Sequence, residues 1–181
     1  MPGGMAPPGM ILRETFANPA MPPSRDDDVI DRAAGLAPGD ALHAARRFRA
    51  KVVEATQASH DALLEEPVEG LSSADRLRVA MHVCALAGAT TLAQHYAERL
   101  AAFEAAGIAP PSPALPAILV FAAKLTTDPR LGDRAAIDAL KRAGLGDAAI
   151  VALAQLVAFL SYQLRVVAGL RAMHATLEST R

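Results

Sequence analysis

The chain has 181 residues, with 18 Lys or Arg against 19 Asp or Glu, so its formal net charge is −1. This length suits one well-buried domain, and the balanced charge offers no broad positive field for nucleic acid or an anionic membrane. Hydrophobic residues make up 52% of the chain but aromatic residues only 4%. A core of Ala, Leu and Val favours closely packed helices, so we expect an all-α protein.

The single cysteine, Cys84, rules out a disulfide within the chain. No His/Cys cluster has zinc-ligand spacing, and we expect neither a metal nor a cofactor. The N-terminal segment lacks the basic start and apolar run of a signal peptide, which favours a cytoplasmic location. The longest uncharged run, residues 148–164, is shorter than the roughly 20 apolar residues of a membrane-spanning helix. We therefore expect a helix buried in protein and no membrane contact.

Residues 1–25 are rich in Pro, Gly and Met and predict a flexible arm, which could still dock on a neighbouring subunit. Residues 26–181 are expected to form a single helical domain. The triplet Asp26-Asp27-Asp28 should open a short helix with a solvated acidic face, ending near Gly35. Asp40 is then the expected N-cap of one long helix over residues 40–66. Its apolar stripe would comprise Leu42, Ala45, Phe48, Val52, Ala55, Ala62 and Leu63, and its basic residues Arg46, Arg47, Arg49 and Lys51 would face solvent.

The clearest helix-break-helix signal lies between residues 71 and 107. Ser72 or Ser73 should cap an apolar helix that ends at Gly88, and Thr90 or Thr91 should cap its successor. Further helices are predicted over residues 114–127, 133–143 and 147–177. This gives six or seven helices and no strand. Leu92, Tyr96, Leu100 and Phe103 form the buried stripe of the helix that follows Gly88.

Two blocks of the chain contain short motifs whose order and spacing are similar to those of a known protein family. The first contains Leu71-Ser72, Arg76 and the apolar helix that ends at Ala87-Gly88. The second contains residues 121–126, 128–129, 139–140, 143–144, 147–148, 150, 157–159 and 165–166. Together they resemble the carboxymuconolactone decarboxylase and alkylhydroperoxidase D-like (AhpD-like) superfamily. The resemblance implies an all-helical bundle that assembles as a homo-oligomer, whether dimer, trimer or hexamer.

The resemblance does not extend to the redox motif of that superfamily, a glutamate followed by Cys-x-x-Cys and a histidine. In a gap-free frame the two cysteine positions are Ala89 and Leu92, the glutamate position is Leu77 and the histidine position is Tyr96. His95 lies one residue before that last position, and a single deletion would bring it into register. The decarboxylase branch also lacks the cysteine pair, and His95 could resemble its acid/base residue.

Five residues are candidates for a site. His95 is the candidate general acid/base, and Tyr96 could donate a phenolic proton or simply pack in the core. Cys84 is either a structural thiol or the nucleophile of a single-cysteine peroxidase, with packing favoured because a buried thiol is inert. His82 is either a satisfied core histidine or a substrate-binding pocket residue. Arg165 either leaves the buried stretch or anchors a subunit or an anionic ligand.

The other polar residues are given structural roles. His43, His60 and His174 are expected at the surface, and Gln155 or Gln163 should bond across a subunit interface. Three functional hypotheses follow. The first is a member without the redox pair, which acts as a non-redox protein or accompanies a redox-active AhpD-like paralogue. The second is a cysteine-independent decarboxylase or lactone-type enzyme using His95, and the third is a single-cysteine peroxidase using Cys84.

Overall fold

A computed structural model describes residues 28–107 and 110–179 of the chain, and the predicted arm over residues 1–25 lies outside them. The described residues form eight α-helices and one 3-10 turn, without a strand, so the predicted all-α class is confirmed. The expected number of six or seven helices is wrong, because residues 40–66 form two helices instead of one. The elements are α1 (Val29–Ala34), α2 (Ala41–Arg47), α3 (Ala50–Glu65), α4 (Ser73–Leu86), α5 (Thr90–Ala105), α6 (Leu115–Thr127), η1 (Pro129–Leu131), α7 (Arg134–Arg142) and α8 (Asp147–Ser179).

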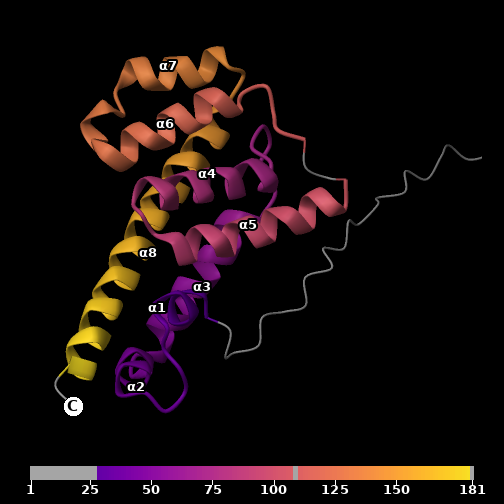
Figure 1. The fold of residues 1–181 in the computed structure, drawn as a ribbon. Coiled ribbons are helices and arrows are strands. Elements are labelled where there is room, and N and C mark those ends of the chain that lie inside the picture. The colour runs from indigo at the N-terminus through magenta and orange to yellow at the C-terminus, as the bar shows by residue number, and fades with distance from the viewer. Residues whose placement is uncertain (1–27, 108–109, 180–181) are drawn as a thin grey trace, which may run out of the picture.

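The long helix α8 is the spine of the molecule (Figure 1). It contacts α6 and α7 near one end, α4 and α3 along its middle, and α1 and α2 near the other end. Helices α4 and α5 pack against each other across the Gly88 turn. The buried residues form a core cluster drawn largely from Ala, Leu and Val, as the composition predicts.

The break between α2 and α3 lies at Phe48 and Arg49, a point that no Gly or Pro marks. The Phe48 side chain is 86% exposed and Val52 is also exposed, so the predicted stripe faces the wrong way. The buried residues of α3 are instead Val53, His60 and Leu64, spaced seven and four apart along one helix face. Sequence analysis placed His60 at the surface, and that prediction is wrong.

Of the acidic triplet expected to form a solvated face, Asp26 and Asp27 lie outside the described residues, and Asp28 is buried instead of solvated. Asp28 caps α1 by accepting backbone N–H groups of Ile30 and Asp31 at 2.9 Å. The Asp28 and Asp31 side chains are buried. Arg46 donates to Asp31 at 2.6 Å and also pairs with Asp28, and Arg47 pairs with Asp31 at 2.8 Å. These charge pairs dock α2 on α1, so Arg46 and Arg47 do not face solvent as predicted.

The predicted turn between α4 and α5 is present. Ser72 caps α4 by accepting the N–H of Asp75, and Gly88 has a φ of 67°, which favours glycine. The expected threonine cap is wrong, because Ala89 occupies the N-cap position of α5 and Thr90 is already helical. The helix predicted over residues 133–143 is present as α7, and Asp133 caps it because its carboxylate accepts the N–H of Ala136.

Helix α8 buries only one face, which corrects the expectation of a run enclosed by protein. Among the described residues, the stretch Asp147–Leu177 is the one helix long and apolar enough to cross a membrane by length and composition alone, and 39% of its most apolar window is buried. Core helices of soluble proteins meet the same criterion. Val151, Tyr162, Met173 and Leu177 are its large exposed apolar side chains.

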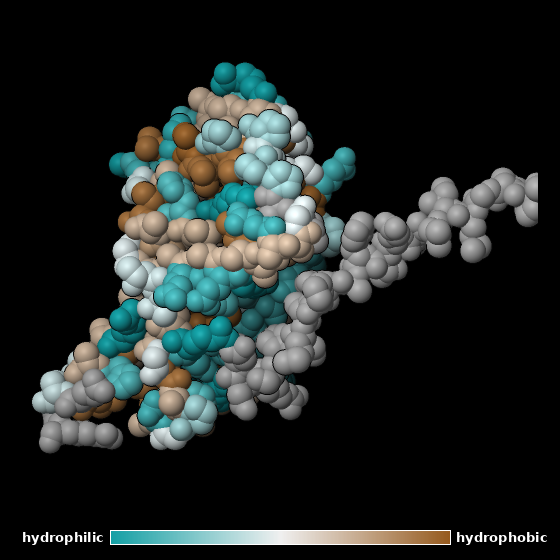
Figure 2. Space-filling model, turned by 45° about the vertical axis from the view of Figure 1, so that its right-hand side comes forward, coloured by the Kyte–Doolittle hydropathy of each residue, from teal (hydrophilic) through white to brown (hydrophobic). Residues whose placement is uncertain are grey.

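Figure 2 shows another apolar region, with brown residues gathered in the upper part of the molecule, at the level of α6 and α7.

Candidate functional site

Four rings from α3, α5 and α8 meet in one cluster, which we call the ring cluster: His60, His95, Tyr96 and Phe159. The centroid of the His60 ring lies 5.9 Å from that of His95, 6.0 Å from that of Tyr96 and 6.2 Å from that of Phe159. The His95 and Tyr96 rings are 5.1 Å apart in an edge arrangement. His60 of α3 therefore links the rings of α5 to that of Phe159 on α8, although the three helices are far apart in the sequence.

His60 is held in one orientation by a carboxylate. Its Nδ1 lies 2.9 Å from Oδ1 of Asp61, and Gln57 donates from Nε2 to the same oxygen at 2.8 Å. A carboxylate can only accept, so this bond places a proton on Nδ1, and Nε2 carries the lone pair whenever the ring is neutral. Burial alone would raise the pKa of Asp61, but the hydrogen bond and charge of His60, the Gln57 bond and Arg99 lower it below its usual value.

Two imidazole nitrogens in the ring cluster have no hydrogen-bond partner among the described residues. They are Nε2 of His60, whose side chain is 2% exposed, and the buried Nε2 of His95. Burying an unpaired polar atom costs roughly 1–3 kcal/mol, so such atoms are rare in folded proteins. Two unpaired nitrogen atoms in neighbouring rings therefore indicate a place where polar groups are retained at a cost in stability.

The His95 ring is neutral at physiological pH. Burial is the main cause of its low pKa, which lies at about 3, and the nearby His60, Arg99 and Arg32 side chains lower it further. A neutral imidazole donates through one nitrogen and accepts through the other. The residue as a whole is only partly buried, so His95 is the member of the histidine pair that borders solvent.

Tyr96 is fixed by a bond to the last helix. Its hydroxyl donates to Oε1 of Gln163 at 2.6 Å, and both side chains are buried. Burial, followed by the neighbouring Cys84, raises the pKa of Tyr96 above its usual range, despite the Gln163 bond. Gln163 thus bonds within the chain rather than across an interface, and Gln155 is exposed. Of the two glutamines expected at a subunit interface, Gln155 is therefore the one for which that prediction stays open.

Cys84 is fully buried in the middle of α4. Burial raises the pKa of its thiol to about 12, so the thiolate that attacks peroxide is almost absent at neutral pH. The geometry agrees with the packing role that the sequence favoured.

Arg76 fixes the end of α3 against α4. Its guanidinium donates to the carbonyl oxygens of Leu63 at 2.8 Å and Glu66 at 2.6 Å, and to the Ser73 hydroxyl at 3.0 Å. These carbonyls belong to the last turn of α3, where helix acceptors lack intrahelical partners. Arg76 therefore holds the helix that carries His60, although it does not touch the ring cluster through these bonds.

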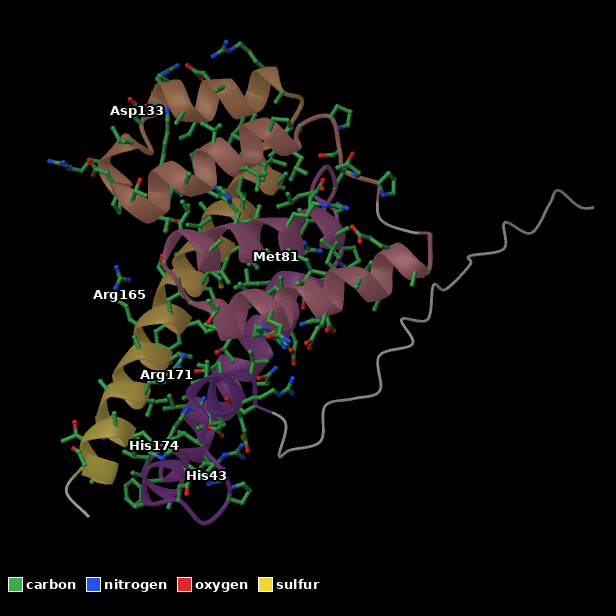
Figure 3. All side chains as sticks on the ribbon, viewed as in Figure 1. His43, Met81, Asp133, Arg165, Arg171 and His174 are labelled. Carbon is green, nitrogen blue, oxygen red and sulfur yellow. The ribbon has the colours of Figure 1, made fainter. Side chains whose placement is uncertain are left out.

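The two predicted substrate-binding residues lie elsewhere. His82 is half-buried on α4, on the same side as the exposed Leu86, so the alternative of a core histidine is wrong. Arg165 is exposed, and Figure 3 shows it projecting outward from α8. It lines a surface cavity of about 430 Å³ with Arg171 and the Gly88 turn. The structure therefore does not bring His82 and Arg165 together with His95.

The remaining histidines, His43 and His174, are not members of the ring cluster. Figure 3 places His43 on α2 and His174 near the end of α8, at the opposite end of the molecule from α6 and α7. His174 lines a cavity of about 340 Å³ with α2 residues. Within residues 28–107 and 110–179, no group of three or more His, Cys, Asp or Glu side chains is arranged to hold a metal ion.

Sequence reasoning missed His60, Asp61 and Gln163 as members of the site. A signal for His60 was present, because Val53, Gln57, His60 and Leu64 recur at spacings of four, three and four. That pattern competes with the apolar stripe through Phe48 and Val52, which is the one that the sequence analysis predicts to be buried.

No family model matches the chain, and no curated protein matches it. Among solved structures, the chain is similar to an uncharacterized peroxidase-related protein from Silicibacter sp. TM1040. The match has 20% sequence identity and a TM-score of 0.54, and covers 78% of each chain. The likeness is one of fold. This chain therefore shares an all-helical architecture with a peroxidase-related protein.

Proposed function

We propose that this protein is an AhpD-like, peroxidase-related protein that works without thiol redox chemistry. The observation that carries the proposal is the state of its only cysteine, because Cys84 is fully buried and its pKa is raised to about 12. A thiol peroxidase needs an accessible thiolate, and the two-cysteine route also needs a second sulfur to resolve the sulfenic acid. The Silicibacter structure supports the fold part of this proposal.

The test is peroxide consumption with dithiothreitol as reductant, comparing the wild-type chain with Cys84→Ser. We expect both proteins to match the protein-free background. Turnover by the wild type that the Cys84→Ser variant lacks would reject the proposal and favour a single-cysteine peroxidase.

The exposed apolar face of α8 supports a role as a partner subunit. Val151, Tyr162, Met173 and Leu177 are 43–56% exposed along this helix, and their spacings of 11, 11 and 4 residues place them on a similar side of it, which a partner could cover. The proposed partner is a second copy of the chain or a redox-active AhpD-like paralogue in the cytoplasm. Light scattering of the pure protein and a pull-down with the paralogue test this, and a monomer that ignores the paralogue would contradict it.

The unpartnered Nε2 of His95 supports an alternative, a cysteine-independent enzyme that acts on small carbonyl or lactone compounds. His95 would serve as acid/base, whereas the Tyr96 hydroxyl is already committed to Gln163. The exposed Arg165 has no place in this scheme. His95→Gln should abolish any such activity, and an unchanged rate would remove His95 from the site.

A further inference from the structure

His60 has the attributes of a buried general base. Asp61 accepts a hydrogen bond from Nδ1 at 2.9 Å, so the neutral ring carries its lone pair on Nε2. Gln57 donates to the same carboxylate oxygen at 2.8 Å and accepts the N–H of Val29 at 3.3 Å, so α1 helps to hold the pair in place. The Asp61 carboxylate would stabilise the imidazolium that forms when Nε2 takes up a proton.

His95 supplies the second polar atom. Its ring centroid is 5.9 Å from that of His60, and its Nε2 is likewise buried without a partner among the described side chains. A small molecule that carries one donor and one acceptor would satisfy both atoms. Two charged groups beside the cluster already have partners, since Arg99 pairs with Glu65 at 2.7 Å and Asp61 lies 2.9 Å from His60. Because burying an ion without a counter-charge is costly, an uncharged ligand suits these surroundings best.

We propose that His60 and Asp61 form a proton-accepting pair that, with His95, binds a small uncharged carbonyl compound and exchanges the proton on the carbon beside its carbonyl. Nε2 of His60 takes this proton as the C–H bond breaks, and the electron pair moves onto the carbonyl oxygen. His95, in the tautomer with a proton on Nε2, donates a hydrogen bond to that oxygen. The His60 imidazolium then exchanges its Nε2 proton with water, and reversal returns a solvent proton to carbon, so the cycle needs no oxidant or reductant. This inference rests on the acid/base alternative above and assigns its base to His60.

The first test follows proton exchange in acetone dissolved in deuterated buffer, by loss of the methyl signal in NMR. General-base catalysis contributes roughly 10²–10⁴-fold. We expect the wild type to accelerate exchange, His60→Gln to lose at least about tenfold of it, and Asp61→Asn to lose part. His174→Gln, at the far end of α8, is the matched control and should keep the wild-type rate. Equal exchange by wild type and His60→Gln would overturn the proposal.

The second test does not depend on a variant that folds. Nitrogen NMR of histidine-labelled wild-type protein should show an unprotonated Nε2 on His60, and its signal and that of His95 should move when acetone is added. A protonated Nε2 on His60, or signals indifferent to acetone, would overturn the proposal. The Cys84→Ser variant should give the same exchange rate and shifts. Cysteine-dependent peroxide turnover would thus reject the non-thiol function without touching this result.

Discussion

The hydroxyl of Tyr96 donates a 2.6 Å hydrogen bond to Oε1 of Gln163, a residue 67 positions later in the chain. Both partners are buried, so neither can exchange the other for water. This bond fixes α5 against α8 beside the histidines. The bond therefore stabilises the packing of the two helices and also holds Tyr96 in position next to His95.

Replacing Tyr96 by Phe should destabilise the protein by roughly 1–3 kcal/mol, because Oε1 of Gln163 would stay buried without a donor. Urea unfolding followed by circular dichroism measures the change. The double variant Tyr96→Phe/Gln163→Leu should recover much of the loss, since no polar group then remains unpaired. Additive losses in the double variant would show that the hydrogen bond is not the cause.

Stability should fall as the pH is lowered from about 6.5 towards 3, in part because of His95. The pKa of His95 is lowered to about 3 in the folded state, against 6.5 for an ordinary histidine. Between pH 6.5 and 3 the unfolded chain therefore binds a proton on His95 and the folded chain does not, which favours unfolding. Above pH 6.5 neither state binds this proton. His95→Gln should show a shallower decline in urea midpoint over this window, with His174→Gln as control. A decline as steep as that of wild type would contradict the assignment.

Asp31→Ala should cost about 3 kcal/mol or more, because it removes a buried carboxylate that pairs with Arg46 and Arg47. Thermal unfolding gives the measurement. Asp138→Ala is the control, since its 4.0 Å pair with Arg134 is exposed and should contribute nothing measurable. Equal midpoints for the two variants would mean that the pairs around Asp31 do not dock α2.

Cys84 should resist Ellman's reagent in the folded protein and react at once in concentrated urea. A thiol pKa of about 12 instead of 9.0 reduces the thiolate fraction at neutral pH about a thousandfold, and full burial blocks access as well. The absorbance of the released thiol reports the rate, with glutathione as the exposed reference. Rapid labelling of the native protein would contradict this prediction and indicate that Cys84 is reactive.

The helices with local boundary signals could be predicted from sequence. Ser72, Gly88 and Asp133 mark ends through their own backbone preferences or capping atoms, and the structure uses each of them. The break near Phe48 carries no such signal. It accompanies the docking of Arg46 and Arg47 on Asp31, a tertiary contact that outweighs the helical pattern of residues 40–66.

The candidate site could be predicted only in part. His95 and Tyr96 were found because the resemblance pointed to the helix after Gly88. His60 was missed because the phase of the α3 stripe depends on which face meets α8, and periodicity alone did not choose between the faces. Asp61 and Gln163 become relevant only through contacts with residues that the fold brings to them.

The ring cluster also has a consequence for how the chain folds during synthesis. His60 and the pair His95-Tyr96 leave the ribosome well before Phe159 and Gln163, which complete their surroundings from α8. Until that last helix emerges and docks, the polar rings remain hydrated and the neighbouring apolar surfaces lack a cover. The site is therefore assembled only after α8 has been synthesised, and a chain truncated within α8 would leave an incomplete core prone to association.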